Sequence, residues 1–450
     1  MATFARAGLE LRNRVMKDPM RVAFFWLSAF YVVYCARPED WIPGLPAIPL
    51  AKITGICAFI ALLGSANKSK RSFKHLPREG YYLLAIIGLM YVSAVFSPVW
   101  KGGAFARTLD FSKMFVAWIL TYLVVTDFQK FRKIIYIQAA SVAVIAVISV
   151  IKGRGHERLE GVLGGIYSNP NDLAFAIVLS LPFCLAFLVT SKSAVKKLAW
   201  LGGMLVMLLA LFMTASRGGF IDLVVTGTVC LWYFGVKGRR FYLIVATAFV
   251  GILLMSVAGG KLKDRFLAVS GEGIDTSMEN RAYGSFEERR FLMIKAVDGI
   301  VHYPLLGIGV RNFPNYSGIW KEVHMSYLQI GVEVGVPALI LYLLFFWRGF
   351  TNLRKIRRRR DLDPEIILFS GALTSSLVGF VVGALFSPEA YQFFPYFAVV
   401  FTSALLAMIV EDEQVSPIEP EKIRLQSGWL GALQNDKKDR KKEDVLLRSR

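Results

Sequence analysis

The residues best suited to chemistry are one histidine and several widely spaced arginines. His324 ends a polar stretch of about sixty residues and begins an apolar run long enough to span a membrane. Arg281, Arg289 and Arg290 lie within the same polar stretch. Arginine binds phosphate through paired hydrogen bonds, and an imidazole with a near-neutral pKa can act as a general base. The pattern therefore indicates chemistry on an anionic substrate at a membrane surface.

Arg217 lies in a very short turn between two apolar runs. Gly218 and Gly219 follow it, and glycines allow a ligand or another backbone to approach closely. This position favours a ligand-binding arginine. An arginine whose side chain reaches the lipid headgroups from a helix end is the structural alternative.

Arg158 precedes another predicted helix start. Asn169 and Pro170 mark a turn, and Asn171 follows them at the beginning of an apolar run. Asn171 either caps the helix or belongs to a helix start whose N–H groups face an anion. Both interpretations remain open on the sequence alone.

The polar stretch contains a predicted amphipathic helix from about Phe286 to Val301. Arg290 lies at the centre of an apolar face made of Phe286, Met293, Ile294, Val297, Ile300 and Val301. Burying an unpaired arginine is very costly, so Arg290 needs an anionic partner. That partner is either a substrate or a structural carboxylate such as Glu333 or Asp222. Glu333 itself lies within the next apolar run and either orients an arginine or pairs with one structurally.

Composition indicates an all-α, polytopic membrane protein. The 450-residue chain is 55% hydrophobic and contains many apolar runs of membrane-spanning length. We expect about twelve transmembrane helices, near 21–38, 48–64, 80–97, 111–126, 134–151, 172–190, 196–214, 219–236, 240–258, 325–347, 366–386 and 393–410. We thus expect an N-terminal segment (1–20), nine helices (21–258), a long loop with amphipathic helices (259–323), three further helices (324–410) and a disordered tail (411–450).

Charge sets the expected topology. Cytoplasmic connections of membrane proteins are rich in Lys and Arg, and alternate connections here are strongly basic. These are the connections around 68–78, 130–133, 192–197, 237–240 and 354–360. Both termini are therefore expected in the cytoplasm, with Arg158, Arg217, Arg290 and His324 together on the opposite side of the membrane. This bias also explains the formal charge of +20 without nucleic-acid binding.

The cysteines and acidic residues do not suggest a metal or cofactor site. The four cysteines lie in apolar runs without metal-ligand spacing, and no HExxH sequence is present. We therefore expect neither metal nor cofactor.

These residues resemble the O-antigen ligase family. The resemblance extends from about Arg158 to the run after His324 and rests on four motifs: NPNDLA, SRGG, ERRFLMIKAVDGIVHYPLLGIGVRNF and HMSYLQIGVEVG. The family commonly has Asn where Met325 stands here, and an aromatic residue where Ile294 stands. The first departure concerns acceptor positioning.

The resemblance implies a periplasmic, metal-independent, inverting glycosyltransferase with an undecaprenyl-pyrophosphate-linked glycan as donor. Arg158, Arg217 and Arg290 would hold the pyrophosphate, and His324 would be the catalytic base. Asn171, Arg289 and Glu333 would support them.

The resemblance leaves the acceptor open. Lipid A-core or a similar glycolipid is the leading acceptor, and a polymerase that joins lipid-linked repeat units is the near alternative. A protein O-glycosyltransferase is a third possibility. A transporter of lipid-linked sugars is the alternative of another class, although no internal repeat supports it.

Overall fold

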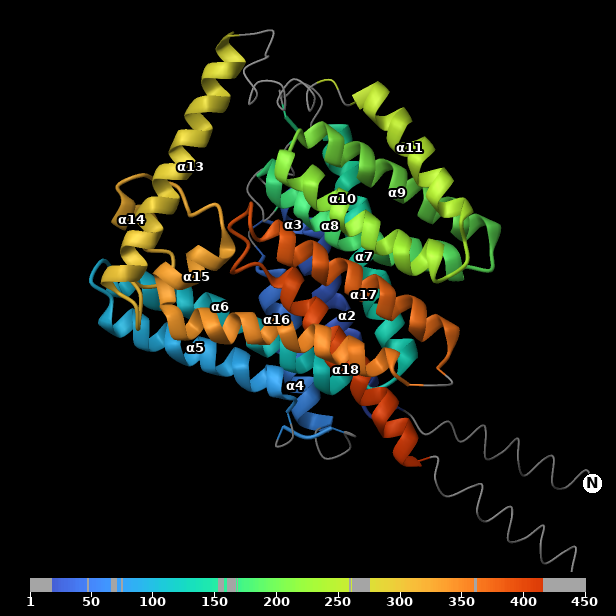
Figure 1. Cartoon of the computed structure of the whole chain (residues 1–450). Coiled ribbons are helices and arrows are strands. Elements are labelled where there is room, and N and C mark those ends of the chain that lie inside the picture. The colour runs from blue at the N-terminus through green and yellow to red at the C-terminus, as the bar shows by residue number, and fades with distance from the viewer. Residues whose placement is uncertain are drawn as a thin grey trace, which may run out of the picture. The chain divides into compact units, whose positions relative to one another are not determined.

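The computed structural model describes residues 18–46, 48–65, 71–73, 76–152, 158–159, 167, 169–258, 260, 276–359 and 362–415. Parts of the expected N-terminal segment, long loop and tail lie outside these residues, as does the side chain of Arg281. The described residues are helical apart from turns and short extended connections, which confirms the all-α class (Figure 1).

The helices follow one another with short connections. They are α2 (Arg21–Ala36), α3 (Pro38–Trp41), α4 (Leu50–Ser65), α5 (Arg78–Phe96), α6 (Lys101–Val124), α7 (Phe128–Lys152), α8 (Pro170–Thr190), α9 (Ala194–Thr214), α10 (Arg217–Leu231), the π-helix η2 (Trp232–Val236), α11 (Tyr242–Ala258), α13 (Thr276–His302), α14 (Phe313–Ser317), α15 (Ser326–Val334), α16 (Val336–Arg357), α17 (Pro364–Gly383) and α18 (Phe393–Val415).

Helix α8 is the most enclosed of the long helices. It packs against α7, α9, α10 and α17, and every residue from Leu173 to Phe187 is buried. Because α8 is apolar on all sides, it needs protein neighbours all round. The Ser376 hydroxyl of α17 donates to the carbonyl of Leu179, next to the helix interruption at Pro182. Helix α8 thus holds α9, α10 and α17 around one axis.

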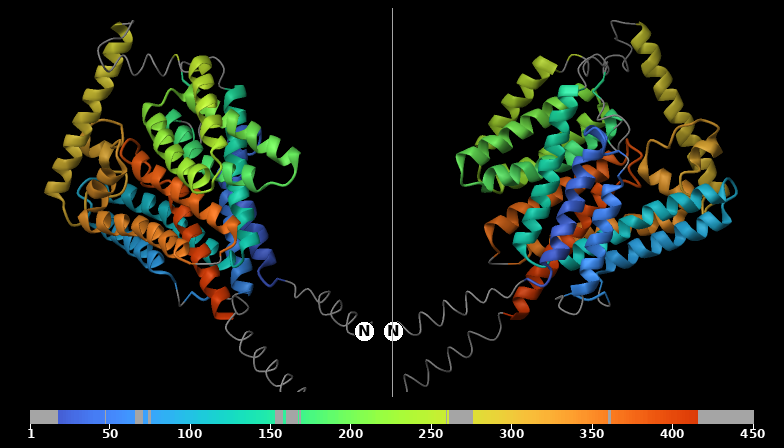
Figure 2. Two further views of the ribbon diagram at one scale, coloured as in Figure 1. Left: turned by 45° about the vertical axis from the view of Figure 1, so that its right-hand side comes forward. Right: turned by 180° about the vertical axis from the view of Figure 1, so that it is seen from behind.

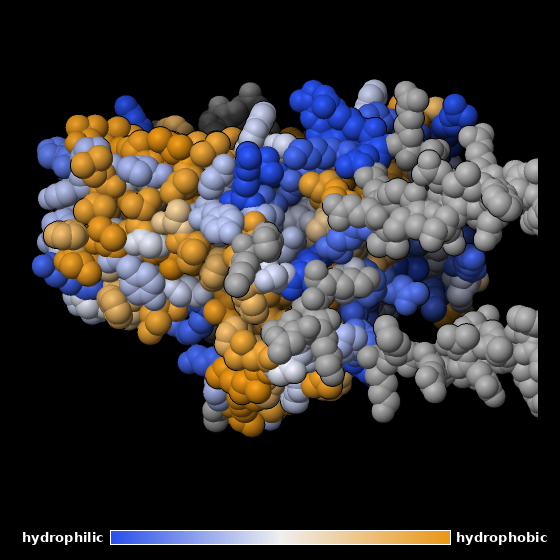
Figure 3. Space-filling view, turned by 90° about the horizontal axis from the view of Figure 1, so that it is seen from below, coloured by the Kyte–Doolittle hydropathy of each residue, from blue (hydrophilic) through white to orange (hydrophobic). Residues whose placement is uncertain are grey.

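The chain is a multi-pass membrane protein. Eight of the described helices are long and apolar enough to span a membrane: α5, α7, α8, α9, α10 continued by η2, α16, α17 and α18. Large apolar side chains also lie exposed on the helix surfaces, as the orange areas of Figure 3 show for one face. Such surface suits contact with lipid tails rather than with water.

The remaining four predicted spans correspond to helices that are shorter or more polar. Three of them match α2, α4 and α11, which are 16, 16 and 17 residues long. The fourth lies within α6, whose first half carries Lys101, Arg107, Asp110 and Lys113. The count of twelve stays a prediction.

The predicted span at 325–347 is wrong, because the helix is broken at Gly335. Gly335 has φ 96°, and a Cβ there would lie 2.4 Å from the carbonyl oxygen of Leu305. Pro337 then stands in the first turn of α16, where its missing N–H costs nothing. The short helix α15 therefore ends at Val334, and the span begins at Val336.

The turn at Pro304–Gly309 packs directly on the end of α15. Ile308 and Gly309 donate their N–H groups to the carbonyls of Val332 and Glu333. A Cβ on Gly307, at φ 64°, would lie 2.5 Å from the carbonyl carbon of Glu333. The glycines of the PLLGIG motif are thus required by the contact between two backbones.

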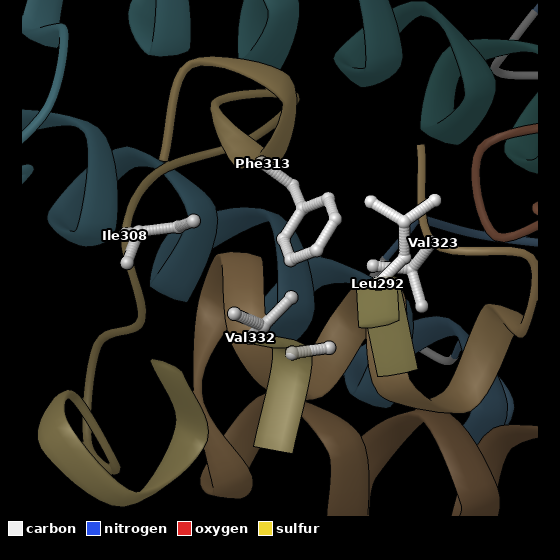
Figure 4. Close-up of a cluster of buried hydrophobic side chains, with 6 residues drawn as sticks. Leu292, Ile308, Phe313, Val323 and Val332 are labelled. Carbon is white, nitrogen blue, oxygen red and sulfur yellow. The ribbon is translucent and has the colours of Figure 1, made fainter. Parts of the chain in front are cut away.

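The predicted amphipathic helix is part of α13, which is longer than expected. It packs on α14 and α15 through Leu292 and Ala296, which join Ile308, Phe313, Val323 and Val332 in a buried cluster (Figure 4). The views in Figure 2 show these three helices together at one end of the bundle. The apolar face named from the sequence is mostly exposed instead: Phe286 is 57% and Val301 70% exposed.

The chain divides into two units after Ala404. All the candidate site residues belong to the first unit. The second unit begins at Leu405, and its described part is the end of α18 up to Val415.

Candidate functional site

His324 lies in the connection between α14 and α15, next to the buried cluster. Its neighbour Val323 is fully buried in that cluster, whereas His324 is partly exposed. The Nδ1 atom of His324 is buried and has no hydrogen-bond partner among the described residues. Burial, followed by the charges of Arg289 and Lys321, lowers the pKa of His324 to about 4, against an opposing effect of Glu288. The imidazole is therefore neutral at physiological pH, as a proton acceptor must be.

Arg289 is the arginine of α13 that lies beside His324. It lies one helical turn before Leu292 and two before Ala296, so it shares the inward face of α13. Burial and then the charge of Arg217 lower the pKa of Arg289, against Glu288. The charge of Arg217 acts on Arg289, and the charge of Arg289 acts on His324, so each of these pairs lies close together. We call Arg217, Arg289 and His324 the arginine cluster.

The interpretation of Arg290 from the helical wheel is wrong. Its side chain is 64% exposed and pairs with Glu287 at 3.7 Å, rather than with Glu333 or Asp222. The wheel placed the buried stripe along the most apolar face, but α13 buries the adjacent face, which includes Leu292 and Ala296. In a membrane protein the most apolar face can point to lipid, so apolarity alone does not locate the inward side.

Arg217 is the first residue of α10. Ser216 caps this helix by accepting a hydrogen bond from the Gly219 N–H. A Cβ on Gly219 would lie 2.7 Å from the Cβ of Ala174, and one on Gly218 3.0 Å from that of Phe386. The two glycines therefore permit close packing of the α10 start against α8 and the connection after α17.

Arg158 and Asn171 join three helix ends. The Nε atom of Arg158 donates to the Thr214 carbonyl at 2.9 Å, and its Nη2 atom donates to the Asn171 Oδ1 atom at 3.3 Å. That same Oδ1 accepts a hydrogen bond from the Ser216 hydroxyl at 2.8 Å. This network fixes the start of α8 against the end of α9 and the start of α10, and so positions Arg217.

Asn171 is not the helix cap. The side chain of Asn169 accepts the hydrogen bond from the Asn171 N–H and caps α8. Pro170 then occupies the first helical position, which suits a residue without an N–H group. The cap lies two residues earlier than expected, and this frees the Asn171 side chain for the network.

Glu333 is fully buried near the end of α15, and its hydrogen bond comes from a tyrosine. Its Oε2 atom accepts the Tyr391 hydroxyl at 2.6 Å. Among the arginines, Arg311 is the one whose charge acts on Glu333. The guanidinium carbon of Arg311 lies 6.0 Å from the centre of the Tyr391 ring. The backbone N–H of Arg311 also donates a hydrogen bond to the Glu333 carboxyl group.

A second group of polar residues lies near Glu333 and the start of α8. The sequence analysis did not predict it. We call it the acidic cluster: Asp172, Arg311, Glu322, Gln329 and Glu389. The Glu322 carboxylate lies 3.8 Å from Arg311 and accepts a hydrogen bond from the Gln329 Nε2 atom at 3.0 Å. The carboxyl groups of Asp172 and Glu389 are hydrogen-bonded to each other.

One signal could have revealed the acidic cluster. Asp172 directly follows Asn171, and Glu322 precedes His324 by two residues, so both adjoin residues already chosen for their chemistry. An anion site is predicted from cations, so these carboxylates did not contribute to the prediction. Gln329 and Glu389 carried no such signal, because only the fold brings α15 and the connection after α17 together.

The buried members of the acidic cluster are incompletely satisfied. Gln329 is 0% exposed, and its Oε1 atom has no hydrogen-bond partner among the described residues. Leaving a buried acceptor unpaired costs about 1–3 kcal/mol. Burial and the Asp172 charge raise the pKa of Glu389 well above its usual range, so Glu389 holds the proton of the carboxyl pair. No group of three or more His, Cys, Asp or Glu residues suited to a metal ion occurs in the described part of the chain.

Comparison with known proteins agrees with the resemblance. The family model of the O-antigen ligase matches residues 202–343. This range contains Arg217, Arg289 and His324, together with the turn on α15. This segment of the chain is similar to the O-antigen ligase family. Arg158, Asn171, Asp172 and Glu389 lie outside the matched range.

Two further proteins are similar to this chain. The exopolysaccharide production protein ExoQ of Rhizobium meliloti (strain 1021) is 25% identical over 279 residues, which cover 56% of this chain and 59% of that relative. The chain thus covers less than two thirds of the relative's length. A chain in a solved peptidoglycan synthase complex is 14% identical with a TM-score of 0.40, and the match covers 74% of this chain and 96% of that chain.

Replacing Arg289 by Gln should raise the pKa of His324 from about 4, because one of the charges that disfavour the imidazolium is removed. Titration of the histidine 13Cε1 signal by NMR in detergent would measure this shift. Arg290→Gln is the matched control, since Arg290 is exposed and pairs with Glu287. A shift in the Arg290 variant with none in the Arg289 variant would contradict the placement of the two arginines.

Proposed function

We propose that the chain is a glycosyltransferase that moves a glycan from undecaprenyl pyrophosphate to a sugar hydroxyl at the periplasmic face of the inner membrane. The observation that carries the proposal is the arginine cluster, in which Arg289 lies beside a neutral His324 and Arg217 lies near Arg289. The match of the O-antigen ligase model to the segment containing all three residues supports it. In this proposal both termini are cytoplasmic.

The arginine cluster suits the pyrophosphate of the donor. The leaving group gains negative charge as its bond to the sugar breaks, and preorganised guanidinium groups stabilise that charge in a low-dielectric site. Arg217 and Arg289 would bind the pyrophosphate directly. Arg158 and Asn171 would position Arg217 through the hydrogen bonds that fix the start of α10.

His324 would accept the proton of the acceptor hydroxyl. The hydroxyl oxygen attacks the anomeric carbon of the donor sugar, and the bond from that carbon to the pyrophosphate oxygen breaks. The pyrophosphate leaves with the bonding electron pair, the configuration inverts, and the imidazole holds the proton. The imidazole is neutral throughout the physiological range, and a bound pyrophosphate would raise its pKa towards the range in which a general base is effective.

The acceptor distinguishes two forms of this function. Transfer to lipid A-core or a similar glycolipid is ligation, and transfer to another lipid-linked repeat unit is polymerisation. The similarity to an exopolysaccharide production protein makes polymerisation the second candidate function. Both forms use the same donor chemistry.

Arg289→Ala should weaken the binding of undecaprenyl pyrophosphate at least about tenfold, because a charge-assisted contact to the pyrophosphate is lost. Arg290→Ala, one residue along the same helix, should bind it as the wild type does, since its side chain points away from His324. Binding can be measured by microscale thermophoresis in lipid nanodiscs. Equal losses in both variants, or none in either, would contradict the proposed donor site.

His324→Ala should reduce transfer by at least about a hundredfold, since the general base is removed. Donor affinity should change less than about twofold, because the pyrophosphate contacts remain. Transfer to a glycolipid acceptor would be assayed in EDTA, and the wild-type rate should persist there. Loss of donor binding in the variant, or loss of wild-type transfer that a divalent ion restores, would contradict the mechanism.

A further inference from the structure

The arginine cluster and the acidic cluster meet at the start of α8. Asn171 belongs to the network that positions Arg217, and the next residue, Asp172, is hydrogen-bonded to Glu389 in the acidic cluster. His324 is near both clusters: the charge of Arg289 acts on it, and Glu322 precedes it by two residues along the chain. Val323, which separates Glu322 from His324, is buried in the cluster around Leu292 and anchors this segment.

The acidic cluster offers many hydrogen-bond acceptors and few donors. The carboxylates of Asp172 and Glu322 and the Oε1 atom of Gln329 are all acceptors, whereas Arg311 is the only cation that defines the cluster. Glu389 already donates its proton to Asp172 and accepts from the Ser387 hydroxyl at 2.8 Å. A ligand for this cluster must therefore donate hydrogen bonds.

Access comes from the rim of the acidic cluster. The side chains of Glu322 and Arg311 are 29% and 40% exposed, and Asp172 is partly exposed. Beneath them, Gln329 is 0% and Glu389 2% exposed. The amide of Gln329 points at Glu322 through its Nε2 atom and leaves a buried acceptor without a partner beside it. A ligand hydroxyl that enters beneath the rim would supply that missing donor.

We infer that the acidic cluster binds the acceptor sugar, and that this sugar is a neutral ring with free hydroxyl groups. Hydroxyl groups satisfy the surplus acceptors, and the ring would present its nucleophilic hydroxyl to His324 opposite the pyrophosphate. An acidic sugar is disfavoured, because its carboxylate would meet Asp172 and Glu322 with only Arg311 to balance them. This inference rests on the proposed function, and it specifies the acceptor class.

The test compares matched neutral and acidic sugars on the full-length protein in nanodiscs. The probes are the methyl glycosides of glucose, galactose and mannose, each paired with the methyl glycoside of its uronic acid. Saturation-transfer NMR measures binding without any donor or activity. At least one neutral probe should bind the wild type at least about tenfold more tightly than its uronic acid partner.

Variants locate that binding. Asp172→Asn and Gln329→Leu should each weaken binding of the neutral probe at least about tenfold. Glu322→Gln should reduce the ratio between the affinity for the neutral probe and the affinity for its uronic acid partner. Glu287→Gln is the matched control, because Glu287 lies on α13 and pairs with the exposed Arg290. Thermal melting would show that each variant is folded. If the Gln329 variant unfolds, the Glu322 variant still tests the inference, because Glu322 is partly exposed.

Three results would overturn the inference. They are equal binding of each neutral and acidic pair, no neutral probe bound by the wild type, and Mg²⁺ or Ca²⁺ binding by calorimetry that the same variants abolish. Undecaprenyl pyrophosphate binding is measured on the same samples. Donor binding without sugar binding would refute this inference alone, and sugar binding without donor binding would refute the proposed function alone.

Discussion

The site depends on positive charge gathered next to a neutral imidazole. Arg217 and Arg289 lie close enough to affect each other, and Arg289 in turn disfavours protonation of His324. Like charges in a partly buried place repel each other unless an anion joins them. A pyrophosphate group relieves that repulsion, so the same arrangement that keeps the base neutral also favours the donor.

Helix ends create this arrangement. The starts of α8 and α10 and the end of α9 are fixed by the hydrogen bonds of Arg158, Asn171 and Ser216, while α13 brings Arg289 from the other side. The broken helix at Gly335 lets the Pro304–Gly309 turn pack on α15 and hold the segment before it. The hydrogen bonds of Asn171 and of the adjacent Asp172 then link the arginine network to the acidic cluster at the start of α8.

Periodicity and charge were sufficient to predict the helical membrane architecture, whereas the roles they suggested for His324, Arg217 and Arg158 stay predictions. Periodicity and charge were insufficient where tertiary packing determines which face of a helix is buried and where a helix ends. The wheel for α13 chose Arg290, because it could not distinguish a lipid-facing stripe from a buried one. The break at Gly335 depends on a backbone contact with Leu305, and the pairing of Asp172 with Glu389 joins segments far apart in sequence. Neither is visible in local sequence patterns.

The most direct test is the pKa of His324 with and without undecaprenyl pyrophosphate. The measurement is a 13Cε1 titration in nanodiscs, with the signal assigned by its loss in His324→Asn. An anion bound at Arg289 offsets the charge that lowers this pKa, so the pKa should rise from about 4 when the ligand binds. An unchanged pKa in a sample saturated with the ligand would contradict a donor pyrophosphate placed between the arginines and the histidine.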